Sequence, residues 1–175
     1  MTASKILTEI AIVDRVGALR QQGRSVVFTN GCFDLLHRGH VTYLEAARAL
    51  GDVLIVAVNS DRSVRALKGP SRPLTPAEDR AHVLAALACV DYVVEFNDET
   101  AERLVQELQP DIYVKGGDYA RDEPVEAAVV RAYGGSVRIL PFTSGYSTTD
   151  LVQRITAGVE QMDSAPPRGG ELSRE

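Results

Sequence analysis

Two of the three histidines in this 175-residue chain, His37 and His40, stand three positions apart with Gly39 between them. They follow Ser25 to Thr29, a β-branched and aromatic run that is typical of a buried strand. A helix that begins near Gly39 would present free N–H groups and its positive dipole end to an anion, and Gly31 would let the backbone approach that anion. Both imidazoles can then face the same phosphate oxygens, which favours electrostatic stabilisation over proton transfer.

The alternative is that these histidines are surface or capping residues, as isolated histidines often are. We favour a functional role because two of them share a four-residue window that follows the first predicted strand of the main domain. The third, His82, lies on a predicted helix without such surroundings and is expected to be structural. Cys32 lies in the same loop without a partner base, and we interpret it as a small packing residue.

Three cationic residues are candidates for phosphate contacts. Lys68 and Arg72 lie in a loop with glycine and proline, from which long cationic chains can close over a polyphosphate. A solvated basic loop is the alternative. Lys115 follows a predicted strand at its carboxyl end and precedes Gly116 and a second glycine, so we expect it to contact nucleotide or sugar phosphate.

Two further groups of polar residues follow predicted strands. Asn59 and Asp61 come at the end of the second strand of the main domain, where Asp61 is equally compatible with binding ribose or metal and with capping a helix. Ser147, Thr148 and Thr149 present hydroxyls and free N–H groups at the start of the last predicted helix, which is a second anion site.

The elements that must position these residues alternate regularly. A helical lead, residues 1–24 with its helix from Ile6 to Gln22, precedes a main domain of residues 25–162 and a tail, 163–175, that is expected to be mobile. Thr75, followed by Pro76 and Glu78, predicts a capping box at a helix start. The pattern predicts an α/β, Rossmann-like fold with a five-stranded parallel sheet and helices on both faces. The strands are expected at 25–29, 53–58, 91–95, 111–114 and 137–140, and the main-domain helices at 41–50, 76–88, 101–108, 123–133 and 147–162.

Composition excludes several classes of protein. Hydrophobic residues make up 45% and charged residues 25%, which is typical of a globular domain. The net charge of -5 argues against a nucleic-acid-binding surface. No apolar run is long enough for a membrane span and no secretory signal is present, so a cytoplasmic protein is expected. Cys32 and Cys89 do not have metal-site spacing, so no protein-ligated metal is predicted.

The stretch from Thr29 to His40 resembles the cytidylyltransferase-like family of the HIGH superfamily, whose members carry an HxGH motif in an α/β nucleotide-binding fold. Further segments, in matching order over roughly residues 25–155, resemble the adenylyltransferase domain of the ADP-heptose synthases. They are Val58-Asn59-Ser60-Asp61, Leu67-Lys68-Gly69 with Ser71-Arg72-Pro73, Val114-Lys115-Gly116-Gly117-Asp118-Tyr119 and Tyr146-Ser147-Thr148-Thr149.

The resemblance implies transfer of AMP from ATP, with Mg²⁺, to D-glycero-β-D-manno-heptose 1-phosphate, giving ADP-heptose and pyrophosphate. It implies catalytic roles for His37, His40, Lys68 and Lys115. It implies nucleotide contacts for Gly31, Phe33, Gly39, Asn59, Asp61, Ser147, Thr148 and Thr149, and sugar-phosphate contacts for Arg72, Gly116, Asp118 and Tyr119. A homodimer is also plausible for this family.

Two departures from the family pattern stand out. Many relatives carry a sugar kinase domain ahead of the transferase, whereas a short helical lead stands there in this chain. Tyr146 precedes Ser-Thr-Thr where close relatives often have a smaller residue. Two alternative functions are a glycerol-3-phosphate cytidylyltransferase-like activity and a nucleotide-binding module without catalysis.

Overall fold

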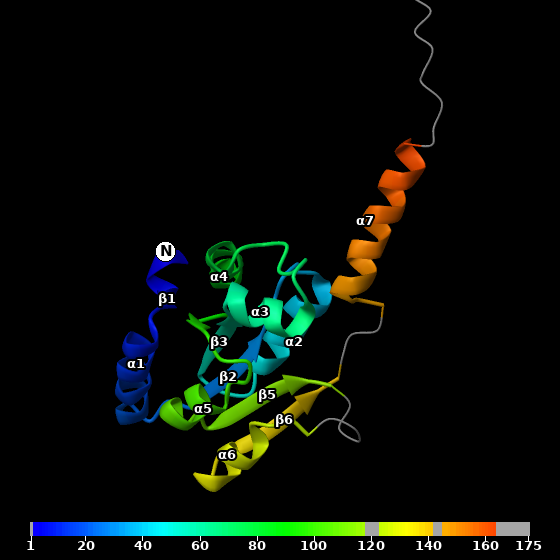
Figure 1. The fold of residues 1–175 in the computed structure, drawn as a ribbon. Helices are drawn as coiled ribbons and strands as arrows, with labels where there is room; N and C mark the ends of the chain where they lie inside the picture. The colour runs from blue at the N-terminus through cyan, green and yellow to red at the C-terminus, as the bar shows by residue number, and fades with distance from the viewer. Residues whose placement is uncertain (1, 118–122, 142–144, 164–175) are drawn as a thin grey trace, which may run out of the picture.

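A single parallel sheet forms the centre of the molecule (Figure 1). The computed structural model describes residues 2–117, 123–141 and 145–163. Within these ranges the sheet has six strands in the order β1-β4-β3-β2-β5-β6, and every neighbouring pair is parallel. The strands are β1 (Ile6–Leu7), β2 (Val26–Gly31), β3 (Val53–Asn59), β4 (Tyr92–Phe96), β5 (Ile112–Gly116) and β6 (Ser136–Leu140).

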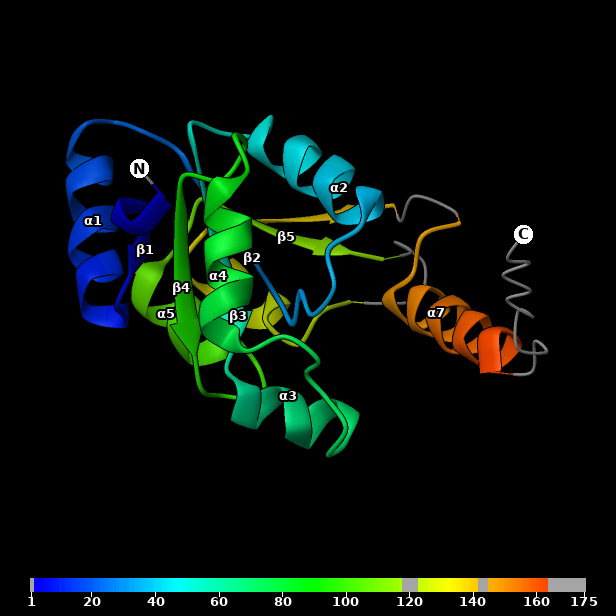
Figure 2. The same ribbon diagram turned by 90° about the horizontal axis from the view of Figure 1, so that it is seen from above.

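Helices cover both faces of the sheet, as expected for parallel strands joined by crossovers (Figure 2). On one face α1 (Glu9–Gln21), α5 (Glu102–Leu108) and α6 (Ala127–Ala132) contribute to one apolar cluster. On the other, α2 (Arg38–Arg48) and α4 (Ala77–Ala86) contribute to a second cluster. The strand β3 is buried along its whole length because both clusters pack against it.

The predicted parallel α/β fold is confirmed, but the sheet has one strand more than predicted. Ile6 and Leu7 were expected to begin the lead helix, and they instead form β1, which pairs with β4. The helix α1 begins later because Thr8 is its N-cap, where the Thr8 hydroxyl accepts from Ala11 N at 3.2 Å. Lys5 fixes this segment by donating from Nζ to the carbonyl of Val90 at 2.7 Å.

The predicted capping box at Thr75 is wrong. Pro76 occupies the N-cap position of α4 and no side chain caps the helix. The backbone N–H of Thr75 instead donates to Asp34 Oδ1 at 3.0 Å, and its carbonyl accepts from Arg80 Nε at 2.8 Å. Tertiary bonds therefore replace the local cap, and they attach this loop to the segment that contains the histidines.

Two further helices are present in the described residues. The helix α3 (Asp61–Lys68) follows β3, begins at the N-cap Ser60 and ends where Gly69 adopts a φ of 93°. The last helix, α7 (Thr148–Asp163), projects away from the sheet (Figures 1 and 2). The predicted tail lies outside the described residues, apart from Asp163.

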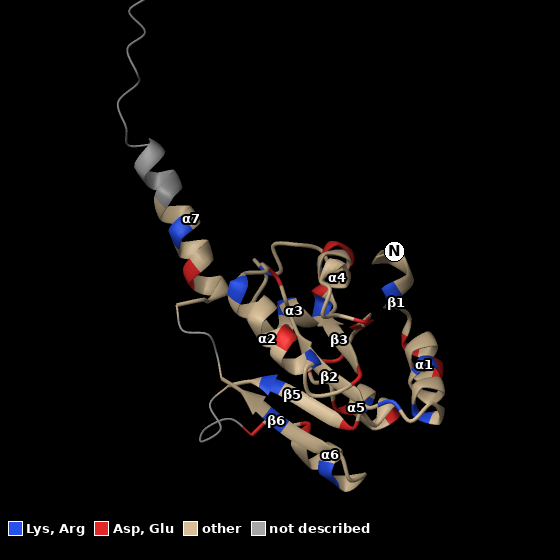
Figure 3. Cartoon of the chain, turned by 180° about the vertical axis from the view of Figure 1, so that it is seen from behind, with Lys and Arg blue, Asp and Glu red and all other residues tan. Residues whose placement is uncertain are grey.

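Basic and acidic residues both occur on α1, α4 and α7 (Figure 3). This distribution fits the modest net charge of the chain and differs from the single basic face that nucleic-acid binding requires. Within the described ranges, every helix is too short or too polar to span a membrane.

Candidate active site

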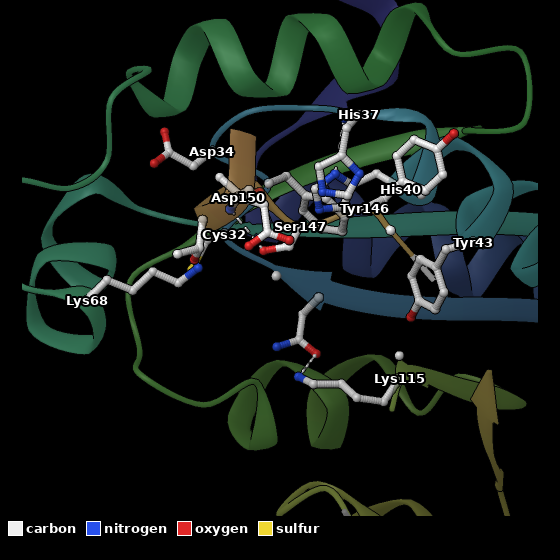
Figure 4. Close-up of a pocket in the computed structure, with 18 residues that line it drawn as sticks. Cys32, Asp34, His37, His40, Tyr43, Lys68, Lys115, Tyr146, Ser147 and Asp150 are labelled. Carbon is white, nitrogen blue, oxygen red and sulfur yellow. Dashed lines mark hydrogen bonds between the residues drawn. The ribbon is translucent and has the colours of Figure 1, made fainter. Parts of the chain in front are cut away.

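A pocket of about 710 Å³ opens at the carboxyl ends of β2 and β5 (Figure 4). This is the edge at which parallel α/β sheets bind ligands. Four segments that are distant in sequence line it: 30–43, the end of α3, the end of β5, and 145–150. Of the predicted site residues, the pocket lining includes Gly31, Phe33, His37, Gly39, His40, Lys68, Lys115, Gly116, Ser147, Thr148 and Thr149.

The two histidines lie ring to ring at the start of α2. Their ring centroids are 3.9 Å apart and the ring planes differ by 27°. His37 is the N-cap of the helix, and the His40 backbone N–H donates to the His37 carbonyl at 2.9 Å. A Cβ on Gly39 would lie 3.1 Å from the His37 ring and 3.0 Å from Tyr146 Cβ. Glycine is needed here because the helix start packs tightly against both aromatic side chains.

Both histidines are held in the neutral form. Burial is the main cause that lowers the pKa of His40 to about 4, and the charges of His37 and Lys68 lower it further. Burial also lowers the pKa of His37, against a smaller opposing effect of a backbone hydrogen bond. The His37 backbone N–H donates to His40 Nδ1 at 3.4 Å, so the neutral His40 carries its proton on Nε2. His40 can therefore donate a hydrogen bond to a phosphate oxygen.

Phe33 supports this pair from the loop. Its φ of 46° lies in the left-handed region, which is rare for a bulky side chain and is tolerated here because the ring is buried, with 7% of the residue exposed. The ring centroid lies 5.5 Å from that of His40. A Cβ on Gly31 would lie 3.1 Å from the same ring, so a glycine at position 31 gives Phe33 its space.

Two lysines bring positive charge to the pocket from two different elements, α3 and β5 (Figure 4). Lys68 is the last residue of α3 and is exposed. Lys115 lies on β5, where its Nζ donates to Asn30 Oδ1 at 3.3 Å. The structure therefore brings both predicted lysines to the histidine pair, although they are 47 residues apart in the sequence.

Arg72 does not line the pocket. Its side chain is 15% exposed and forms an ion pair with Asp34, with 2.7 Å between Nη1 and Oδ2. The other carboxylate oxygen of Asp34 accepts from the backbone N–H groups of Leu74 at 2.8 Å and Thr75 at 3.0 Å. Asp34 is buried and attaches loop 69–76 to the histidine segment, a role that we did not predict from the sequence. The predicted contact of Arg72 with sugar phosphate stays a prediction.

Asn59 and Asp61 also lie outside the pocket lining. Asp61 Oδ1 accepts from Arg80 Nη2 at 2.8 Å, and the Asn59 carbonyl accepts from the same nitrogen at 2.8 Å. Arg80 is 2% exposed and also donates to the Cys32 carbonyl. Ser60 is the N-cap of α3, so Asp61 does not cap it. Both residues thus bind Arg80 within the protein, and their predicted contact with nucleotide stays a prediction.

The start of α7 forms the remaining wall. Ser147 Oγ accepts from the Asp150 backbone N–H at 3.3 Å, as the capping-box spacing predicts. Tyr146 lies against His37, with 6.2 Å between ring centroids, and Arg38 lies 6.0 Å from the centre of the Tyr146 ring. Tyr146 thus places an aromatic ring beside the histidine pair.

Several residues at the site were not predicted from the sequence. Arg80 could have been found, because it falls at helical spacing among the buried Ala77, Ala81 and Leu84 of α4. Asn30 and Tyr43 line the pocket, but nothing in their sequence surroundings distinguishes them. Asp118 and Tyr119, predicted to contact sugar phosphate, lie outside the described residues.

Known proteins provide an independent comparison. A curated relative from Syntrophotalea carbinolica, "Bifunctional protein HldE", is 51% identical over 158 residues, which cover 90% of this chain and 32% of the relative. A protein of the same name from Ectopseudomonas mendocina is 57% identical over 136 residues, 78% of this chain and 29% of the relative. The chain thus spans about a third of the length of these relatives.

The fold also has a solved counterpart. The lipopolysaccharide core biosynthesis protein from Thermoplasma volcanium is 30% identical, with a TM-score of 0.58, over 71% of this chain and all of that one. Residues 28–154 match the model of the family described as "Cytidylyltransferase-like". This match extends from β2 into α7 and includes every wall of the pocket. The chain therefore belongs to the cytidylyltransferase-like family.

Proposed function

We propose that the chain is a nucleotidyltransferase that transfers AMP from ATP to D-glycero-β-D-manno-heptose 1-phosphate and releases pyrophosphate. One observation carries the proposal: two neutral imidazoles, the start of α2, the start of α7 and two lysines meet in one pocket. Backbone N–H groups, imidazole donors and ammonium groups are all suited to phosphate oxygens. A triphosphate supplies enough of these oxygens to occupy them together.

The imidazoles stabilise charge by donating hydrogen bonds. The pKa of His40 near 4 keeps the free enzyme's ring neutral at pH 7, so the ring is not a proton source. Donors that are already placed where charge develops cost no reorganisation during the reaction. Lys68 and Lys115 add fixed positive charge on two sides of the same space.

The reaction needs no strong general base. A sugar-phosphate oxygen attacks the α-phosphorus of ATP, the bond from that phosphorus to the bridging oxygen breaks, and pyrophosphate leaves with the electron pair. The attacking phosphate monoester is already largely ionised near neutral pH. Catalysis then consists of positioning the two substrates and stabilising charge on the α-phosphoryl group.

Mg²⁺ enters the proposal as part of the substrate MgATP, where it neutralises phosphate charge. The pocket residues offer few ligands for a metal, so the nucleotide phosphates would supply most of the ligands of Mg²⁺. Asp34 Oδ1 accepts backbone N–H groups and Oδ2 is ion-paired with Arg72, and the described ranges contain no cluster of three potential ligating side chains. Mg²⁺ is commonly held by one or two carboxylates together with substrate phosphates, and Asp150 is the other carboxylate that lines the pocket.

The choice of heptose rests on similarity. The resemblance to adenylyltransferase domains of ADP-heptose synthases and the identity of 51% to 57% with relatives named HldE both support it. A cytoplasmic location and a homodimer are parts of the same proposal.

A substrate panel tests the proposal. ATP and CTP are each combined with heptose 1-phosphate and glycerol 3-phosphate, and pyrophosphate release is measured with Mg²⁺ present. We expect release with ATP and heptose 1-phosphate. Release only with CTP and glycerol 3-phosphate would support the cytidylyltransferase alternative instead. Nucleotide binding without release from any pair would indicate a binding module and would overturn the proposed activity.

A further inference from the structure

Three polar side chains, Asn30, Tyr113 and Lys115, form a triangle at the pocket, and Asn30 and Lys115 line it. Asn30 is the residue before the last of β2, and it shares a face of the sheet with Phe28, which pairs with Tyr113. Tyr113 and Lys115 lie two residues apart on the neighbouring β5, so all these side chains point to the same face. Tyr113 Oη donates to Asn30 Oδ1 at 2.7 Å. Lys115 Nζ donates to Asn30 Oδ1 at 3.3 Å and to Tyr113 Oη at 3.4 Å. Two of the three donors of the Lys115 ammonium are therefore occupied, and one is left for a ligand.

The position of the triangle relative to the histidines is informative. Figure 4 shows Lys115 and His40 on opposite sides of β2, with both residues at the pocket. A substrate phosphate in the pocket would thus contact the histidines on one side and Lys115 on the other. Lys115 can make that contact only if its ammonium stays at the carboxyl end of β5.

Two of the three groups of the triangle are buried, and Lys115 is partly buried. Tyr113 is fully buried and its ring stacks on Phe28 with 6.1 Å between centroids. Asn30 is 9% exposed. Burial, and then the charge of Glu126, raise the pKa of Tyr113 well above its usual range, so its hydroxyl stays protonated. That hydroxyl fixes the Asn30 amide with its oxygen toward Lys115.

We propose that Asn30 and Tyr113 are positioning residues that hold the Lys115 ammonium at the pocket before substrate binds. This inference rests on the proposed function of the site and adds two residues to it. A lysine side chain loses considerable rotamer freedom when a ligand immobilises it. Fixing it in advance saves part of that cost, which corresponds to roughly threefold to tenfold in affinity or rate.

A double-mutant cycle tests the proposal. Tyr113→Phe removes the hydroxyl and keeps the ring, and Lys115→Met removes the ammonium. In the wild-type background we expect Tyr113→Phe to weaken MgATP affinity or lower kcat/KM by roughly threefold to tenfold. In the Lys115→Met background the same substitution should change either quantity less than twofold, because its effect acts through the lysine.

A matched control uses Tyr133, a tyrosine whose hydroxyl forms a hydrogen bond outside the pocket. Tyr133 Oη donates to the Pro110 carbonyl, away from the pocket lining, so Tyr133→Phe should leave MgATP affinity unchanged in both backgrounds. An equal loss from Tyr113→Phe with and without Lys115, or no loss in the wild type, would overturn the positioning role. Should Tyr113→Phe fail to fold, Asn30→Leu takes its place in the same cycle.

Nucleotide affinity is measured for each variant of the cycle by calorimetry, in addition to turnover. Because affinity does not depend on heptose turnover, the result of the cycle is independent of the substrate panel. A second arm with MgCTP covers the alternative choice of base. A coupled cycle without heptose turnover would reject the proposed substrate and retain the positioning role. Normal heptose turnover with an uncoupled cycle would reject only the positioning role.

Discussion

Lowering the pH should reduce the free energy of unfolding, because the folded chain disfavours protonation of His40. Its pKa falls from the ordinary 6.5 to about 4 because the ring is partly buried beside His37 and Lys68. The unfolded chain then binds a proton below pH 6.5 that the folded chain binds only below about pH 4. By linkage, stability is unaffected above pH 6.5 and is lost progressively as the pH falls from 6.5 toward 4.

The size of the loss follows from the same two values. At pH 5 the difference in proton binding corresponds to about 2 kcal/mol at 1.36 kcal/mol per pH unit. The His40 ring borders an open pocket, so we reduce this to about 1 kcal/mol for solvent screening. The substitution His40→Asn removes the titrating group and should remove the same amount of pH dependence.

Urea unfolding at pH 7.5, 6.5, 5.5 and 5.0 measures the effect, and an NMR titration of the imidazole gives its pKa directly. The control His82→Asn removes an exposed histidine, and we expect it to keep the wild-type dependence. Comparing variants is necessary because carboxylates also begin to titrate near pH 5. A His40 pKa above 6, or equal slopes for wild type and His40→Asn, would refute the reasoning.

Three other outcomes are expected. His40→Ala should lower kcat by roughly 10²-fold with little change in urea midpoint, since it removes a donor that acts on the transition state. Asp34→Ala should lower the free energy of unfolding measured in urea by about 3 kcal/mol, because it leaves Arg72 buried without its partner. Lys68→Met should raise the pKa of His40 only slightly above about 4 in an NMR titration, since it removes the smallest of the causes that lower it and leaves the ring buried.

Local pattern was sufficient to predict most of the fold and the centre of the site. Strands such as β3 are continuous apolar runs, and each is followed by a helix with a regular apolar stripe. The spacing of His37 and His40 places both at one helix start, so their proximity follows from sequence alone. The order of strands and helices also places Lys115 at the same edge, because carboxyl ends of parallel strands share it.

The differences arise where distant groups override local signals. Ile6 and Leu7 have helical spacing relative to the residues that follow, but an available edge of β4 pairs with them as a strand. Thr75 has the composition of a cap, yet its backbone bonds to Asp34, 41 residues away in sequence. The buried contacts of Arg80 with Cys32, Asn59 and Asp61 likewise depend on the folded arrangement. Sequence spacing carries no information about such pairs.

The central claim is that the two imidazoles and the start of α2 bind the reacting phosphoryl group. A crystal structure of the chain with Mg²⁺ and an ATP analogue that carries a methylene group between the α- and β-phosphorus tests it most directly. We expect His37 and His40 nitrogens within about 3.2 Å of phosphate oxygens, including one on the α-phosphorus. A triphosphate bound elsewhere, with both rings free of it, would contradict the account.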